Sequence, residues 1–148
     1  MPRINLQVFR TDHPPALGLG QRLPAIRLLT HVSLTKTAGW TDFRLAVIDT
    51  GAPVSLLPPL IWRQAERREL GRVSLGGVAR RKECQIPAIL AEVTCRLSDG
   101  VTSIGPVLTH AYLAEHDNVP TLIGMLGFIE RGVLRVELAR NRAFLRLP

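Results

Sequence analysis

Asp49 directly follows an apolar run at residues 45–48 and precedes Thr50, Gly51 and Ala52. The run is rich in aliphatic and β-branched side chains, which predicts a buried strand that ends at the carboxylate. A carboxylate in that place loses hydration and needs compensating hydrogen bonds. Gly51 lets the backbone turn sharply, so that N–H groups can face the carboxylate. The pattern predicts a carboxylate held rigidly at the floor of a cavity, where it is suited to acid–base chemistry.

The elements around Asp49 read as mostly β with one clear helix. The predicted strands cover residues 4–9, 25–35 and 41–49, followed by a hairpin of residues 85–97 and 101–114 and a last hairpin of residues 134–138 and 143–147. A helix is predicted from Pro58 to Leu70, with prolines in its first turn and Gly71 after its end. A shorter helical turn is predicted at residues 128–131.

The composition describes one globular domain. The chain has 148 residues, 46% of them hydrophobic and 21% charged, which is enough to bury a core. Prolines and glycines before residue 25 predict an irregular N-terminal arm over residues 1–24 and a folded domain over residues 25–148. The net charge is +7, with local clusters at residues 63–72 and 80–82. No aromatic-interleaved basic stripe accompanies this charge, which argues against nucleic acid as a partner, while an acidic partner or substrate stays open.

Other classes of site and location have little support in the sequence. Cys84 and Cys95 match no metal spacing and are expected to be free thiols in a reducing compartment. No stretch of about 18 apolar residues occurs, so we expect a cytoplasmic protein without a membrane partner. The histidines show no ligand spacing, so no metal is expected; they are His13, His31, His110 and His116.

Residues 45–55 resemble the catalytic loop of the retroviral-type aspartic proteases (retropepsins), in which an apolar strand leads into Asp-Thr/Ser-Gly-Ala and a serine commonly follows, here Ser55. Near the C-terminus, two apolar residues and a glycine resemble the second signature of the family, and a short helix and a strand follow. A glycine-bearing segment at residues 73–78 resembles the flap that closes over substrate. The second signature is Leu122, Ile123 and Gly124, and the flap residues are Leu75, Gly76, Gly77 and Val78.

The resemblance implies a single-domain, bacterial-type retropepsin with a closed, β-barrel-like acid-protease fold and one or two short helices. It also implies an aspartic endopeptidase that acts on peptide or protein substrates without a cofactor. This chemistry needs two carboxylates that share one proton and one water. Because the chain holds one Asp-Thr-Gly, the expected enzyme is a two-fold homodimer with Asp49 from each subunit. Thr50 would cross-bond the two loops, and residues 143–147 would join a dimer sheet.

Three positions refine the expectation. Ala52 stands where pepsin-like enzymes often have a serine that bonds the catalytic carboxylate, so an optimum at mildly acidic to neutral pH is expected. Met125 and Leu126 replace the polar residues that retropepsins often carry after the second glycine, which affects the contacts that support the C-terminal helix.

Simpler interpretations remain beside these. Asp49 can be a turn-forming aspartate, with Thr50 and Ser55 satisfying backbone groups, and Gly76-Gly77 can be an ordinary hairpin turn. The alternative function is a non-catalytic dimer of the same fold that binds peptides or, through its basic surface, nucleic acid.

Overall fold

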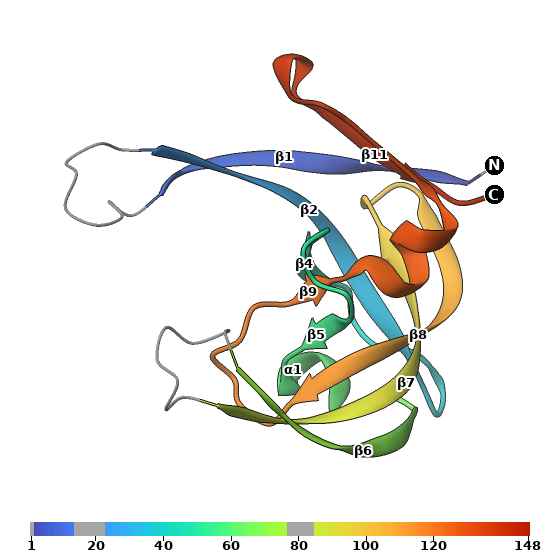
Figure 1. Ribbon diagram of the computed structural model, residues 1–148. Helices are drawn as coiled ribbons and strands as arrows, with labels where there is room; N and C mark the ends of the chain where they lie inside the picture. Colours follow the sequence, from blue (N-terminus) through green and yellow to red (C-terminus); the bar gives the residue numbers. More distant parts are fainter. Residues whose placement is uncertain (1, 14–22, 77–84) are drawn as a thin grey trace.

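The computed structural model describes residues 2–13, 23–76 and 85–148 of the chain (Figure 1). The described part is mostly β, as predicted. Its strands are β1 (Arg3–His13), β2 (Leu23–Lys36), β3 (Gly39–Trp40), β4 (Arg44–Ile48), β5 (Ser55–Leu57), β6 (Arg67–Leu75), β7 (Ile86–Ser98), β8 (Ser103–Ala114), β9 (Leu122–Ile123), β10 (Val133–Glu137) and β11 (Arg142–Arg146). The short helices are α1 (Pro59–Trp62), η2 (Met125–Ile129) and η3 (Leu138–Arg140).

The strands form one mixed sheet whose pairings run in the order β10-β11-β1-β2-β4-β9-β5-β8-β7-β6, and β3 pairs with β2. The pairs β4–β9 and β5–β8 are parallel, whereas the other pairs are antiparallel. An additional pairing joins β2 to β7. The pairings therefore make a circuit from β2 through β4, β9, β5, β8 and β7 back to β2. Strands of this circuit contribute many residues of the main core, together with β1 and β11.

The predicted hairpins are confirmed. Strands β7 and β8 pair antiparallel around Asp99 and Gly100, and β10 and β11 pair antiparallel at the C-terminal end. Asp99 also ties its hairpin to the first strand, because its Oδ2 accepts a hydrogen bond from the Asn5 backbone N–H at 2.9 Å. Burial favours the neutral form of this carboxyl, but the backbone N–H groups of Thr102, Asn5 and Val101 outweigh it and lower the pKa of Asp99.

The N-terminal segment is more regular than the sequence predicted. Strand β1 runs from Arg3 to His13, and it pairs with β11 through residues 3–6 and with β2 through residues 7–13. The predicted strand at residues 4–9 is therefore confirmed, and the expected irregular arm is wrong for the rest of residues 3–13. The additional length comes from pairing with β11 and β2, which the local sequence pattern did not indicate. The Pro- and Gly-rich residues 14–22 lie outside the described chain.

The predicted helix over residues 58–70 is also wrong for most of its length. Helix α1 begins at Pro59, as the proline rule indicated, but it ends at Trp62. The charged run belongs to β6, where Arg68 lies opposite Glu92 of β7 and forms a side-chain ion pair with it. Gly71 lies at an irregularity in this pairing and does not end a helix. Cross-strand pairing has overridden the helix propensity of the Arg- and Glu-rich segment.

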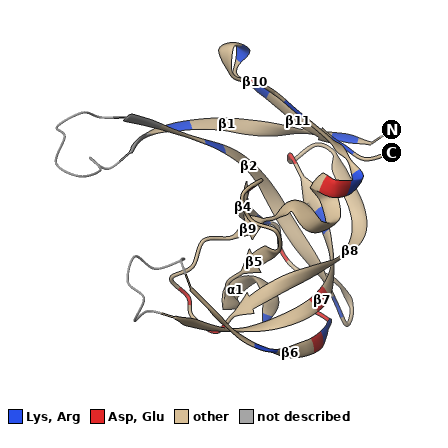
Figure 2. Cartoon of the chain, viewed as in Figure 1, with Lys and Arg blue, Asp and Glu red and all other residues tan. Residues whose placement is uncertain are grey.

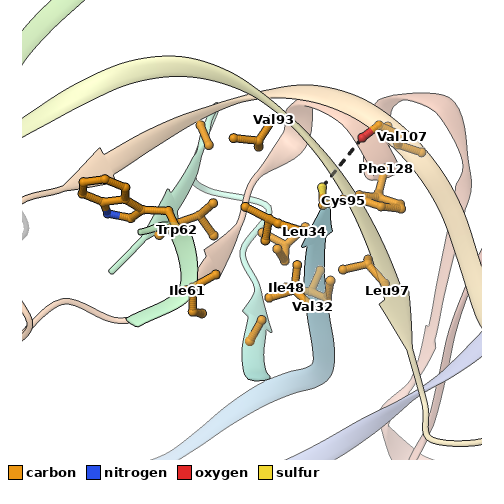
Figure 3. Packing of buried hydrophobic residues seen from close by; sticks show 14 of the residues in the cluster. Val32, Leu34, Ile48, Ile61, Trp62, Val93, Cys95, Leu97, Val107 and Phe128 are labelled. Carbon is orange, nitrogen blue, oxygen red and sulfur yellow. Dashed lines mark hydrogen bonds between the residues drawn. The ribbon is translucent and has the colours of Figure 1, made fainter. Parts of the chain in front are cut away.

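The core lies between the strands of the circuit and α1 (Figure 3). Val32 and Leu34 of β2 face Val93, Cys95 and Leu97 of β7 in one buried cluster. Phe128 enters the same cluster from η2, and Trp62 from α1, with its indole N–H donating to the Ala114 carbonyl at 2.9 Å. The prediction that Trp62 packs in the core is confirmed. In the described chain no helix has the length and apolar character that crossing a membrane requires.

Cys95 is a free thiol inside this cluster, with its Sγ 3.8 Å from the Val107 carbonyl oxygen. Burial raises its pKa to about 12, because the thiolate would lose its hydration there. Cys84 lies outside the described residues.

We expect Cys95 to resist alkylation by iodoacetamide in the folded protein at pH 7 to 9, since the reactive thiolate is suppressed over that whole range. In urea the same residue should react readily. Peptide mass spectrometry that resolves Cys95 measures both states. Rapid alkylation of Cys95 in the native protein would show that β7 and β8 open often.

Candidate active site

The loop after β4 holds the Asp49 carboxylate by short-range backbone bonds. The Gly51 N–H donates to Asp49 Oδ1 at 2.9 Å, and the Ala52 N–H donates to the Asp49 carbonyl at 3.3 Å. The Asp49 N–H itself donates to the Ile123 carbonyl at 2.9 Å. A backbone hydrogen bond from the turn to the carboxylate is therefore present, as we predicted from the glycine at position 51. The carboxylate is held at the end of a strand while Asp49 stays half-buried.

The second predicted motif lies directly against this loop. Strand β9, which carries Leu122 and Ile123, pairs in parallel with β4 and in antiparallel with β5. It thus lies between the strand that leads into Asp49 and the strand that leaves the loop. The Met125 N–H also donates to the Ala52 carbonyl at 2.8 Å, so main-chain bonds join the two motifs on both sides of Gly124.

Gly124 has almost no space around its Cα. A Cβ built there would lie 2.7 Å from the Ala52 carbonyl oxygen, 2.7 Å from the Val54 carbonyl carbon and 2.8 Å from the Val54 oxygen. Its buried N–H donates to Ser55 Oγ at 3.0 Å. Ser55 thus satisfies a backbone N–H group, which is the simpler of the two roles considered for it. The bond also joins the segment that follows Asp49 to the second motif. The absent side chain at position 124 is what allows the two chain segments to touch.

The replacement of polar residues by Met125 and Leu126 leaves the following helix supported through the main chain. The Leu126 N–H donates to the Pro53 carbonyl at 3.1 Å. The Gly127 N–H donates to Glu130 Oε1 at 2.8 Å, which satisfies a donor at the start of the last helical turn. A Cβ at Gly127 would lie 2.6 Å from Thr109 Oγ1, so this glycine also permits a close approach.

Asp49 and Thr50 line an open cleft of about 560 Å³. The walls are largely apolar and come from β2, β4, β9 and β10. Within the described chain, Asp49 is the only acidic residue that lines the cleft, and Arg27 is the basic one. The wall residues are Ala25, Ile26, Leu28, Val47, Ile48, Leu122, Val136 and Leu138.

The wall contributed by β2 and β10 is the part of the site that the sequence did not indicate. Ile26, Val136 and Leu138 are large apolar residues that remain exposed. Strand β2 lies more than 80 residues before the second motif, and β10 follows shortly after it. Neither strand carries a recognisable sequence signature. The pairing of β1 with both β2 and β11, and of β11 with β10, brings β2 and β10 to the same side of the loop that follows β4.

The predicted flap residues are placed only in part. Leu75 ends β6 and Gly76 follows it, whereas Gly77 and Val78 lie outside the described residues. The β6–β7 pairing makes this segment the end of a hairpin. Leu75 packs against the small buried cluster of Leu56, Ala114 and Val119, and so does Leu122 of the second motif. The base of the hairpin and the second motif thus share one packing surface.

Several Lys and Arg residues lie along the strands near the chain ends, β1, β10 and β11 (Figure 2). A hollow of about 500 Å³ on this part of the sheet is lined by Arg3, Arg135, Arg140 and Arg142, with Glu137 as the acidic residue among its described walls. Arg3 lies over the Phe144 ring at 5.0 Å from its centroid. Because these arginines come from both ends of the sequence, the cluster was not visible as a charged run.

No family model matches the chain, and no curated protein or solved structure matches it significantly. Within residues 2–13, 23–76 and 85–148, no three His, Cys, Asp or Glu side chains are grouped so that they could hold a metal ion. The chemistry of the site must therefore be argued from Asp49 and its surroundings.

Replacement of Gly124 by alanine should destabilise the fold by about 2 kcal/mol or more, because the new methyl group meets backbone atoms that have no room to move. Gly71→Ala is the matched control, since a Cβ there meets nothing within 4 Å. Urea denaturation of both variants measures the difference. Equal stability of the two variants would mean that the loop and β9 can separate without cost.

Proposed function

We propose that the protein is a retropepsin-like aspartic endopeptidase that works as a homodimer. The observation that carries the proposal is the Asp49 carboxylate, which accepts a hydrogen bond from Gly51 and lies in an open apolar cleft, next to the second motif. The circuit of strand pairings and the short helix after Gly124 support a closed, barrel-like acid-protease fold.

One subunit holds half of the catalytic machinery. Aspartic proteolysis uses two carboxylates about 3 Å apart, and their mutual repulsion keeps one proton between them. Among the described residues that line the cleft, Asp49 is the only acidic one. A two-fold dimer supplies Asp49 of the partner subunit as the second group. Thr50, next to Asp49 in the sequence, is exposed, and in the proposed dimer its hydroxyl would bond across the two-fold axis.

The two carboxylates divide the chemistry of hydrolysis. The ionised member takes a proton from a water molecule as its oxygen attacks the amide carbonyl carbon. The neutral member donates its proton toward the carbonyl oxygen, which gives a neutral gem-diol. The C–N bond then breaks as a proton passes to the leaving nitrogen, and the products are a carboxylic acid and an amine. The Gly51 N–H holds one Asp49 oxygen in place during these steps.

An extended peptide fits the shape of such a site. Peptides bind aspartic proteases as an added strand, with main-chain bonds for affinity and side-chain pockets for preference. The exposed apolar side chain of Ile26 in the cleft favours apolar residues next to the cleaved bond. Leu75 and Gly76, at the end of the β6–β7 hairpin, are the described residues of the proposed flap.

The first test is Asp49→Asn, which keeps the size of the side chain and removes its acid–base chemistry. We expect the wild type to cleave a proteome-derived peptide library at mildly acidic to neutral pH and the variant to lose activity at least about a thousandfold. Mass spectrometry identifies the cut sites. Equal cleavage by both proteins would assign the activity to a contaminant.

Subunit mixing tests whether two copies share one site. An excess of Asp49→Asn should inhibit the wild type by forming mixed dimers with a single competent carboxylate, and activity should fall on dilution. Asp42→Asn is the control excess protein, since Asp42 is an exposed acidic residue on the segment between β3 and β4, outside the cleft. Undiminished wild-type activity in the presence of exchanged Asp49→Asn subunits would refute the shared site.

The arginine-lined hollow supports a second candidate function, the binding of nucleic acid by a dimer that does not cleave. Arg side chains suit phosphate because their planar fork donates two parallel hydrogen bonds. Phosphate binding would weaken steeply with salt, and Arg142→Gln should reduce the salt slope by about one. Fluorescence anisotropy with single-stranded DNA measures this. Arg63→Gln is the control, because Arg63 is an exposed residue at the end of α1 and lines a different hollow. No binding at low salt would remove this candidate.

A further inference from the structure

The strand expected to join a dimer sheet has no free edge. Strand β11 pairs with β1 on one side and with β10 on the other. Its apolar side chains are already used inside the subunit, since Leu145 is 0% exposed and Ala143 is 5% exposed. The expectation that residues 143–147 pair with a second copy is therefore wrong for this fold, and the contact must involve another surface.

Strand β10 is the edge of the sheet on that side. Within the described chain it pairs with β11 alone, so one row of its backbone N–H and C=O groups has no strand partner. The β10–β11 hairpin extends away from the remaining strands, which leaves that edge accessible (Figures 1 and 2). Three large apolar residues on or next to it are exposed: Val133 is 46% exposed, Val136 40% and Leu138 37%. An open apolar edge of this kind is a template for another strand.

The charges on β10 select one register for a second copy. Arg135 and Glu137 lie on the same face of the strand and form an ion pair, 2.6 Å between Nη2 and Oε1. In an antiparallel pair whose two-fold axis passes through Val136, Arg135 lies opposite Glu137 of the partner subunit, and Glu137 lies opposite the partner's Arg135. An axis at Arg135 would place two arginines opposite each other, and an axis at Glu137 two glutamates. Opposite charges across a strand pair stabilise it and like charges destabilise it.

The same axis lies beside the catalytic cleft. Val136 lines that cleft together with Asp49, Thr50 and Leu138. A partner that pairs through Val136 therefore reaches the open side of the cleft, which is where the second Asp49 is needed.

We infer that β10 is the dimerisation seam, and that its partner is β10 of a second copy, paired antiparallel about Val136. The inference rests on the homodimer proposed above and names the surface that builds it. It requires that Arg135 and Glu137 form ion pairs between subunits as well as within one subunit.

Charge reversal at single positions followed by mixing tests the seam. Arg135→Glu gives the edge two negative charges, and Glu137→Arg gives it two positive charges. Each variant alone should dimerise roughly tenfold or more weakly than the wild type, because both cross-strand pairs become repulsive. An equimolar mixture should recover dimers of wild-type strength, since both cross-strand pairs are then opposite in charge. The pair within each subunit stays broken in both variants, so recovery reports contacts between subunits alone.

Sedimentation velocity over a concentration series measures these dissociation constants without relying on proteolysis. Arg146→Glu is the matched control, since Arg146 is on β11, whose two edges are both paired, and its reversal should leave dimerisation unchanged. Wild-type dimerisation in both single variants would overturn the seam and leave the homodimer to another surface. A wild type that stays monomeric at high concentration would overturn both. Restored dimers in the mixture without any peptide cleavage would support the seam and count against the protease.

Discussion

The contact between Gly124 and the loop that follows Asp49 is the constraint on which the rest of the site depends. Backbone atoms of Ala52 and Val54 lie where a side chain of residue 124 would have to be. This approach lets β9 lie between β4 and β5, and it lets Gly124 donate to Ser55. The proposed chemistry, in which two carboxylates about 3 Å apart share one proton and one water, would need this rigidity.

The same geometry bears on the proposed homodimer. The backbone N–H of Asp49 donates to the Ile123 carbonyl, and its carboxylate accepts a bond from the Gly51 N–H. The cleft beside it opens on the side where β2 and β10 leave apolar side chains exposed. Exposed apolar side chains that lie together mark sites of interaction. In the proposed dimer the β10 edge of a second copy meets this side of the cleft, so the proposed activity and the proposed seam involve neighbouring surfaces.

The two errors in predicting the elements have a common origin. Strand β1 is longer than predicted and β6 was predicted as a helix, because both are stabilised by cross-strand pairing, with β11 and β2 for β1 and with β7 for β6. Strand propensity depends on such neighbours far more than helix propensity does. The local signals that did hold were proline at the start of α1, and Asp99-Gly100 between β7 and β8, because those depend on nearby backbone alone.

The sequence by itself determined the mostly β class, the C-terminal hairpins and the turn that holds Asp49, since apolar periodicity and glycine act within a few residues. It also indicated that residues 49–52 and 122–124 belong together, although through resemblance and without a geometric reason. The tertiary structure alone decided that a missing Cβ at Gly124 permits that contact, that β11 is closed on both edges, and that β10 is open beside the cleft. These features depend on which distant strands become neighbours, and that is set by packing of the whole chain.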